Sequence, residues 1–201
     1  MKNLYLRSML AVACAATLAA CGGSGGNLYL GGQVSGLFKD GLILQNGDES
    51  LPVASGASSF YFTKLVNTDD RYNITIKEQP KGAVCEISNG SGKASSYSVT
   101  TAYVTCKTNT YPLSGAITGL TGEGLTLVIG SNSAGPLKGS TSYTFPAIAD
   151  GAPYNISILT TPAGLTCRFA GSASADGHDI VGTMGSAATT GATLNCTPQQ
   201  Q

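Results

Sequence analysis

The sequence contains an internal repeat, which limits the folds that the chain can adopt. The segment YNITIKEQPKGAVC at residues 72–85 returns 82 positions later as YNISILTTPAGLTC at residues 154–167. The likeness continues in the same order along both copies: GQVSGLFKDGLILQN (32–46) matches GAITGLTGEGLTLVI (115–129), SFYF (59–62) matches SYTF (142–145), and AYVTC (102–106) matches ATLNC (192–196). Because each copy has the length of a small domain, the repeat predicts two modules folded in tandem.

Each copy consists of short segments with the periodicity of β-strands. Apolar and polar residues alternate over residues 72–77 and again over 154–158. A period of two is typical of strands, and turn residues recur about every 8–12 positions, as in β-sandwiches. We therefore predict an all-β chain of two tandem β-sandwich modules, residues 28–107 and 112–198, with a linker too short for free tumbling. SNGSG at residues 88–92 predicts a type I′ hairpin turn.

The first 20 residues predict a secretory signal peptide. Lys2 and Arg7 precede the apolar run MLAVACAATLAA at residues 9–20. This run is shorter than the roughly 20 residues that a membrane-spanning helix needs. A basic start, an apolar stretch and small residues before a boundary are typical of a secretory signal.

The boundary LAAC at residues 18–21 resembles the lipobox of bacterial lipoproteins. In that family the signal is cut before the cysteine, whose sulfur carries a diacylglycerol. The resemblance implies lipidation of Cys21, a flexible spacer over residues 21–27, and anchoring in a membrane. In that family, Asp directly after the cysteine favours retention in the inner membrane. Position 22 is Gly, so the resemblance implies the outer membrane. It leaves open whether the modules face the periplasm or the cell surface. The alternative is an ordinary secreted protein with Cys21 as an odd thiol.

Four cysteines remain beyond this boundary, two in each copy. An exported compartment is oxidising enough for disulfides to persist. Among the possible pairings, the repeat favours the one that closes each copy on itself, Cys85 with Cys106 and Cys167 with Cys196. Because apolar residues share the face of each cysteine, both bridges are predicted to point inward. Zinc is the alternative for paired cysteines, but the chain has no CxxC motif and only one histidine, so we predict no metal site.

The ordered pattern, which in the first copy runs from SGL (35–37) and GLILQN (41–46) through YNITIKEQPKGAVC (72–85) to VTC (104–106), resembles a known type of repeat. It is similar to the immunoglobulin-like (Ig-like) repeats found in tandem in uncharacterised lipoproteins and surface proteins of Gram-negative bacteria. The resemblance covers nearly all of residues 31–198. It implies two Ig-like sandwiches on the cell envelope, without an assigned activity. The second copy departs from the pattern where AGSAS (170–174) replaces the Asn-Gly turn.

Few side chains suggest chemistry. His178 lies between Asp176 and Asp179, but groups this close in a Gly-rich stretch favour a solvated loop over a catalytic base. The G-x-S-x-G match at residues 22–26 belongs to the spacer rather than to a nucleophile elbow. Calcium is an alternative to ordinary turn residues at three acidic pairs: Asp48 with Glu49, Asp69 with Asp70, and Asp176 with Asp179. Turn residues are the favoured interpretation, and we predict no enzyme and no cofactor.

The function predicted from these features is a non-enzymatic, envelope-anchored lipoprotein that acts as a structural or protein-interaction module, surface-exposed and antigenic. Lys and Arg are scattered singly, so nucleic acid is not an expected partner. The expected partners are the membrane, through the N-terminal lipid, and an unknown protein or glycan. The alternative function is a carbohydrate-binding or adhesin-like sandwich, for which Tyr61, Tyr97 and Tyr103 are candidate exposed aromatics although the chain has no Trp.

Overall fold

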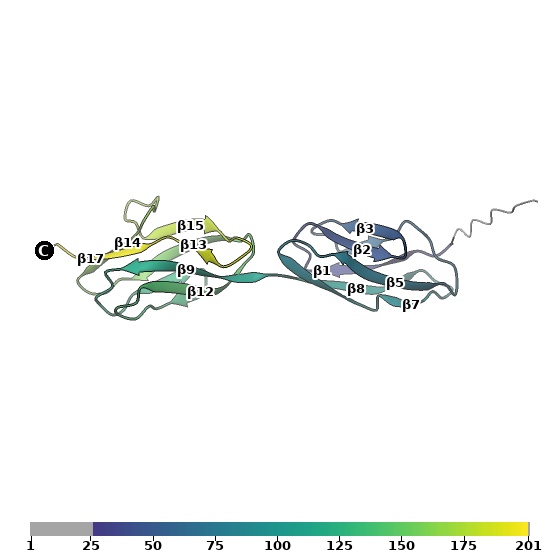
Figure 1. The fold of residues 1–201 in the computed structure, drawn as a ribbon, viewed down its shortest axis with the longest axis horizontal. Helices are drawn as coiled ribbons and strands as arrows, with labels where there is room; N and C mark the ends of the chain where they lie inside the picture. Colours follow the sequence, from purple (N-terminus) through teal and green to yellow (C-terminus); the bar gives the residue numbers. More distant parts are fainter. Residues whose placement is uncertain (1–25, 201) are drawn as a thin grey trace, which may run out of the picture.

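The computed structural model describes residues 26–200, which fold into 17 β-strands without a helix. This described part accordingly contains no helix with the length and apolar character needed to cross a membrane. The strands form two modules that follow one another end to end (Figure 1). Module 1 contains β1 (Leu30–Ser35), β2 (Leu42–Asn46), β3 (Glu49–Val53), β4 (Ser59–Tyr61), β5 (Arg71–Glu78), β6 (Ala83–Ser88), β7 (Ser91–Lys93) and β8 (Val99–Thr108). Module 2 contains β9 (Thr110–Thr118), β10 (Thr126–Ile129), β11 (Asn132–Ala134), β12 (Ser142–Ala149), β13 (Pro153–Thr160), β14 (Leu165–Phe169), β15 (Asp179–Thr183), β16 (Thr189–Thr190) and β17 (Leu194–Pro198).

Each module is a sandwich of two sheets, and the strand order is the same in both modules. Module 1 has the sheets β4-β1-β8-β6 and β3-β2-β5-β7, while module 2 has β12-β9-β17-β14 and β11-β10-β13-β15. The last strand of each module runs parallel to the first, β8 beside β1 and β17 beside β9, and the short β16 also pairs parallel with β9. The predicted fold class is confirmed as an all-β chain of two tandem β-sandwich modules.

Each module has its own hydrophobic core between its two sheets. The fully buried positions coincide in the two copies of the repeat: Leu30, Leu44 and Val104 in module 1 match Leu113, Leu127 and Leu194 in module 2. Full burial of a leucine or valine side chain contributes about 1.5–3 kcal/mol relative to exposure. The repeated apolar positions are therefore the ones that hold the two sheets together.

The two disulfides pair as the repeat predicts, Cys85 with Cys106 and Cys167 with Cys196. Each bridge joins neighbouring strands of one sheet, β6 to β8 and β14 to β17, at residues that lie directly opposite one another. All four cysteines are buried, which confirms that the bridges point into the cores. Each module is thus closed by a covalent link of its own.

The hairpin predicted at SNGSG is wrong. β6 pairs with β8, whereas β7 pairs with β5 in the opposite sheet, so the chain crosses between sheets at Asn89 and Gly90. A type I′ turn needs a positive φ at both central residues, and only Asn89 has one, at 54°. The Gly90 carbonyl instead accepts a hydrogen bond of 2.7 Å from the Ile74 amide of β5. Module 2 makes the same crossing, because β15 also pairs with the opposite sheet, through β13.

The junction between the modules is a single residue, Asn109, between β8 and β9. Its amide donates to the Gly82 carbonyl of module 1, and its carbonyl accepts from the Asp150 amide of module 2, both at 2.9 Å. The Lys39 ammonium of module 1 donates to the carbonyl and to carboxylate Oδ1 of Asp150, both at 2.7 Å. Hydrogen bonds from Lys39 and then from Ser186 hold the pKa of Asp150 below its usual 3.8. Asp150 is therefore ionised at neutral pH, and its ion pair with Lys39 links the two modules.

Candidate functional site

One flank of module 1 exposes three tyrosines. Tyr61 on β4 is 52% exposed, Tyr103 on β8 is 38% exposed, and Tyr29, directly before β1, is 59% exposed. Strand alternation explains their direction, since Leu28, Leu30, Gly32 and Val34 are buried. Of the positions between them, Tyr29 and Gln33 are exposed and Gly31 is covered by the Tyr61 ring. Register brings the tyrosines together: Tyr61 lies opposite Gly31 of β1, and Tyr103 lies opposite the exposed Gln33. We call Tyr29, Gln33, Tyr61 and Tyr103 the tyrosine face.

The position of the Tyr61 ring depends on the absence of a side chain at Gly31. A Cβ atom at Gly31 would lie 2.6 Å from Cδ1 of Tyr61, so the ring passes directly over the strand. Beside it lies an open depression of about 540 Å³, lined by Tyr29, Tyr61, Phe62 and Thr63. Small-molecule sites typically have volumes of roughly 300–1,000 Å³ and a largely apolar, aromatic lining. The depression has the size and the lining of such a site.

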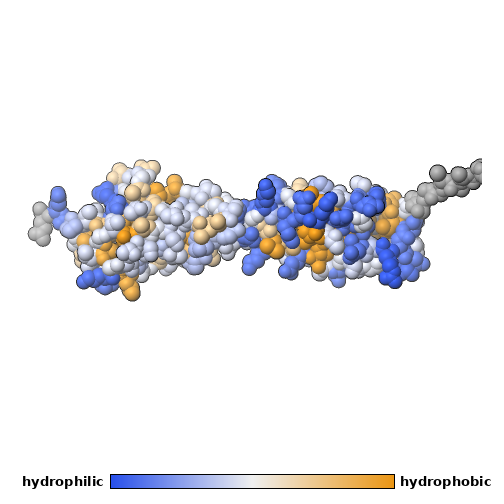
Figure 2. Space-filling model, in the orientation of Figure 1, coloured by the Kyte–Doolittle hydropathy of each residue, from blue (hydrophilic) through white to orange (hydrophobic). Residues whose placement is uncertain are grey.

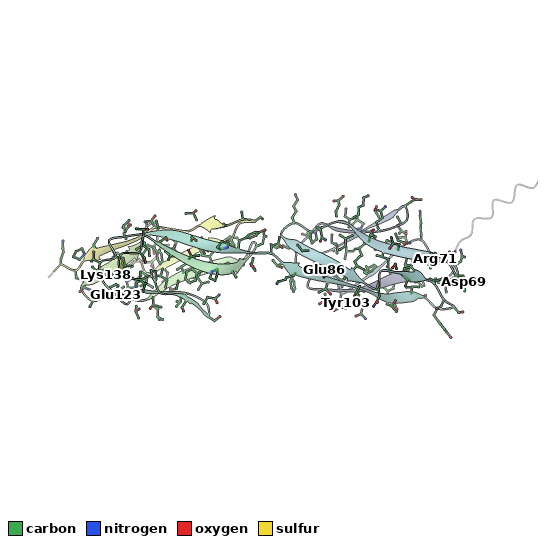
Figure 3. The ribbon with its side chains drawn as sticks, turned by 60° about the horizontal axis from the view of Figure 1, so that its bottom comes forward. Asp69, Arg71, Glu86, Tyr103, Glu123 and Lys138 are labelled. Atoms are coloured by element: carbon green, nitrogen blue, oxygen red, sulfur yellow. A yellow bond between two sulfur atoms is a disulfide. The ribbon has the colours of Figure 1, made fainter. Side chains whose placement is uncertain are left out.

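The centre of the tyrosine face is free of charge although module 1 is the more charged module. Asp, Glu, Lys and Arg number 14 in residues 28–107 and 6 in residues 112–198. Figure 2 shows the strongly hydrophilic colour concentrated over module 1, with a paler surface over most of module 2. On the exposed side of β4, β1 and β8, the residues next to the tyrosines are Ser, Thr and Gln. Two carboxylates lie at the edge of the face: Glu86 on β6, beside Tyr103 (Figure 3), and Glu49, which accepts hydrogen bonds from Thr63 next to Tyr61.

Module 2 has the same flank without aromatic residues. In the repeat alignment, Tyr29, Tyr61 and Tyr103 correspond to Pro112, Thr144 and Thr193. Gly31 corresponds to Ser114, whose hydroxyl lies 2.9 Å from the Thr144 hydroxyl, so these two small side chains bond to each other. The sandwich fold therefore does not require a tyrosine face, and its presence in module 1 alone points to a role other than folding.

Two of the four residues of the tyrosine face were predicted from the sequence as candidate exposed aromatics. Tyr61 and Tyr103 are brought onto one flank, whereas Tyr97 lies in the loop before β8, where it is 80% exposed. The prediction from the sequence does not include Tyr29 and Gln33. The available signal was alternation, because Tyr29, Gly31 and Gln33 alternate with apolar residues just ahead of the repeated GQVSG stretch.

The edge of β6 is closed by a side chain, which bears on the ways in which module 1 can bind a partner. Cys85 has its backbone amide and carbonyl directed away from β8, and the Gln79 carboxamide bonds to both, at 2.8 and 2.9 Å. Unpaired strand edges are a common route to strand addition by another chain. At Cys85 the Gln79 carboxamide already occupies that position, which blocks strand addition at this residue.

The loop around His178 has the geometry of a solvated turn. The His178 amide donates to carboxylate Oδ1 of Asp176 at 3.2 Å, and the His178 ring lies 3.5 Å from the other oxygen of the same carboxylate. The backbone hydrogen bond from His178, followed by the Ser174 hydroxyl, lowers the pKa of Asp176. Asp179 faces elsewhere, accepting a hydrogen bond from the Ser157 hydroxyl. The three residues therefore do not converge on one point.

The other acidic pairs also stabilise local turns. Glu49 accepts hydrogen bonds from the amide and hydroxyl of Thr63 at 2.6 and 2.7 Å. Burial disfavours its charge, yet these hydrogen bonds hold the pKa of Glu49 below its usual 4.5. Asp69 pairs with Lys93 at 2.9 Å, and Asp70 accepts from the Asn67 amide at 2.7 Å. Within residues 26–200, no group of three or more His, Cys, Asp or Glu side chains is placed to hold a metal ion. Cys21, the predicted lipidation site, lies outside the described residues.

Comparisons with known proteins do not assign a family. No protein-family model matches the chain, and no curated protein matches it. Among solved structures, the TIE protein of Bacillus anthracis is similar at 10% identity with a TM-score of 0.46, covering 83% of this chain. This chain spans only 33% of the TIE protein.

Two structures of Streptococcus pyogenes major pilins are also similar. One, a variant of the major pilin, has 10% identity and a TM-score of 0.35, with 86% of this chain and 98% of the pilin covered. The other, the T-13 major pilin, has 10% identity and a TM-score of 0.33, with 86% of this chain and 97% of the pilin covered. With TM-scores below 0.5, these three likenesses carry no argument about function.

Proposed function

We propose that this chain is a non-enzymatic lipoprotein of the cell envelope whose modules act as an interaction element close to a membrane. The tyrosine face is the observation that carries the interaction role, because it exposes three aromatic side chains in one module of two. Tyrosine is enriched at binding surfaces, since its rigid ring gives contact area at a low cost in conformational entropy. Surface exposure on the cell, and with it antigenicity, form part of the proposal.

The interaction role is tested by cross-linking from Gln33, which lies between the tyrosines. A photoreactive amino acid at residue 33 should capture a ligand on intact cells. The matched control is residue 116, an alanine at the corresponding position of module 2. We expect cross-linked species from residue 33 and none from residue 116, observed as shifted bands that depend on irradiation. Equal labelling from both positions, or from neither, would contradict an interaction role for this face.

The envelope location rests on the LAAC boundary and the GGSGG spacer that follows Cys21. Several acyl chains, at about 0.8 kcal/mol for each buried CH₂, make release from a bilayer very slow. We therefore expect a Cys21→Ala variant to move from the membrane fraction to the soluble fraction. The control is Cys14→Ala, within the predicted signal peptide, which should stay with the membrane. Retention of Cys21→Ala in the membrane fraction would rule out this anchor.

A separate experiment tests whether the modules lie on the cell surface or in the periplasm. Protease added to sealed cells should cleave the modules, as the proposed surface exposure requires. Cleavage only after the outer membrane is permeabilised would place the modules in the periplasm and withdraw the antigenic role.

A further inference from the structure

We propose that the tyrosine face of module 1 binds an uncharged oligosaccharide. This inference gives a ligand class to the interaction role proposed above and rests on that role. The binding of a sugar at this face does not depend on a lipid at Cys21.

The first element is an apolar surface shaped for stacking. A pyranose ring presents a face of C–H groups that carry a partial positive charge, while its hydroxyls lie around the rim. The face of an aromatic ring is negative and apolar, so the two surfaces complement each other. Tyr61 passes over Gly31 and borders the depression of about 540 Å³ together with Tyr29. The depression therefore offers aromatic surface to a sugar ring.

The second element is a set of uncharged hydrogen-bonding groups between the tyrosines. Gln33 lies on β1 between Ser59 of β4 and Tyr103 of β8, opposite both. A carboxamide and hydroxyls each offer donors and acceptors, as sugar hydroxyls do. The four residues of the tyrosine face are uncharged, and the carboxylates at its edge, Glu49 and Glu86, repel an acidic ligand, so the complementary ligand is a neutral sugar.

The dimensions of the face favour an oligosaccharide over a single sugar and over a protein. Tyr61 and Tyr103 are on strands separated by β1, which places them about 10 Å apart across the sheet. A ligand that contacts both must be longer than one sugar ring. A stable protein interface buries about 800 Å² on each partner and relies on apolar anchors at its centre. The tyrosine face has the polar side chain of Gln33 at its centre instead.

The corresponding flank of module 2 lacks the tyrosines. It keeps the strand order and register of module 1, with Ser114 opposite Thr144 where module 1 has Gly31 opposite Tyr61. Both features that stacking needs, the ring and the empty position beneath it, are therefore changed together. This pairing makes the double variant Ser114→Gly/Thr144→Tyr a way to build part of the face in module 2.

The test is a titration of the purified chain, lacking its signal peptide, with cellotetraose, maltotetraose and chitotetraose. Binding can be followed by calorimetry and by tyrosine fluorescence, because the chain contains no Trp. We expect at least one of the three to bind with a dissociation constant of about 1 mM or lower. Tyr61→Ala and Tyr103→Ala should each weaken that binding about tenfold, because each removes a stacking ring.

Two controls separate stacking from loss of structure. Tyr61→Phe keeps the ring and should bind nearly as the original chain does. Phe38→Ala removes an aromatic residue of module 1 that is 77% exposed but lies in the turn after β1, so it should have no effect.

Three outcomes would overturn the inference. One is the absence of binding to all three sugars at about 10 mM, and another is binding that survives the Tyr61→Ala/Tyr103→Ala double substitution. The third is a protein cross-linked at residue 33 together with no sugar binding. That third result would leave the proposed interaction role intact while removing the ligand class, so the two failures are distinguishable.

Discussion

Removal of either disulfide should lower the free energy of unfolding of its own module by about 3 kcal/mol. The bridges close loops with sequence separations of 21 and 29, and each loop lies within one module. A cross-link of this length restricts the unfolded chain and so destabilises it relative to the folded state. Calorimetry of Cys85→Ala/Cys106→Ala and Cys167→Ala/Cys196→Ala variants should show a lower unfolding temperature for one module in each case.

Each double variant serves as the control for the other. Because neither bridge crosses between modules, the transition of the unsubstituted module should keep its temperature within error. Loss of both transitions in one double variant would show that the modules unfold as a single unit. An unchanged pair of transitions would show that the bridge restricts the unfolded chain less than its loop length predicts.

Phe145→Ala should destabilise module 2 by about 3–5 kcal/mol, the range for truncating a buried phenylalanine. Phe145 is fully buried between the sheets and makes an edge-to-face contact with Tyr143, with ring centroids 6.2 Å apart. Truncation removes this contact and leaves a cavity that the surrounding strands cannot fill without moving. Hydrogen exchange should show faster exchange throughout module 2, while module 1 keeps its protection.

Module 1 provides a matched substitution, since Phe62 is the counterpart of Phe145 in the repeat and is 2% exposed. Phe62→Ala should accelerate exchange in module 1 in the same way. Phe38→Ala, at an exposed position, should change stability by less than about 0.5 kcal/mol. A large effect of Phe38→Ala, or a small effect of Phe145→Ala, would contradict the placement of these side chains.

The candidate site was only partly accessible from the sequence. Exposed tyrosines could be proposed from composition and spacing, and Tyr61 and Tyr103 were named on that basis. Tyr97 was named by the same argument, yet it lies in a loop. The number of tyrosines does not reveal which of them share a flank, because that depends on strand pairing between distant segments.

The hairpin predicted at Asn89 and Gly90 is wrong for a related reason. An Asn-Gly pair indicates a tight turn, but it does not say whether the next strand joins the same sheet or the opposite one. Here β7 pairs with β5, and the Gly90 carbonyl is held by Ile74 of that strand. The pairing of β7 with β5 in the opposite sheet, rather than local turn chemistry, therefore sets the path of the chain after β6.

The two modules, their β-sandwich class and the disulfide pairing could be predicted from the sequence alone. These properties follow from a repeat and from a period of two, both of which are local patterns that a single chain displays directly. The tertiary structure alone decided the order of strands in each sheet, the junction between Lys39 and Asp150, and the tyrosine face. Tyr29, Tyr61 and Tyr103 are far apart in the sequence and become neighbours only when β4, β1 and β8 pair in one register. Such non-local pairing depends on the packing of the whole module, so no short stretch of residues encodes it.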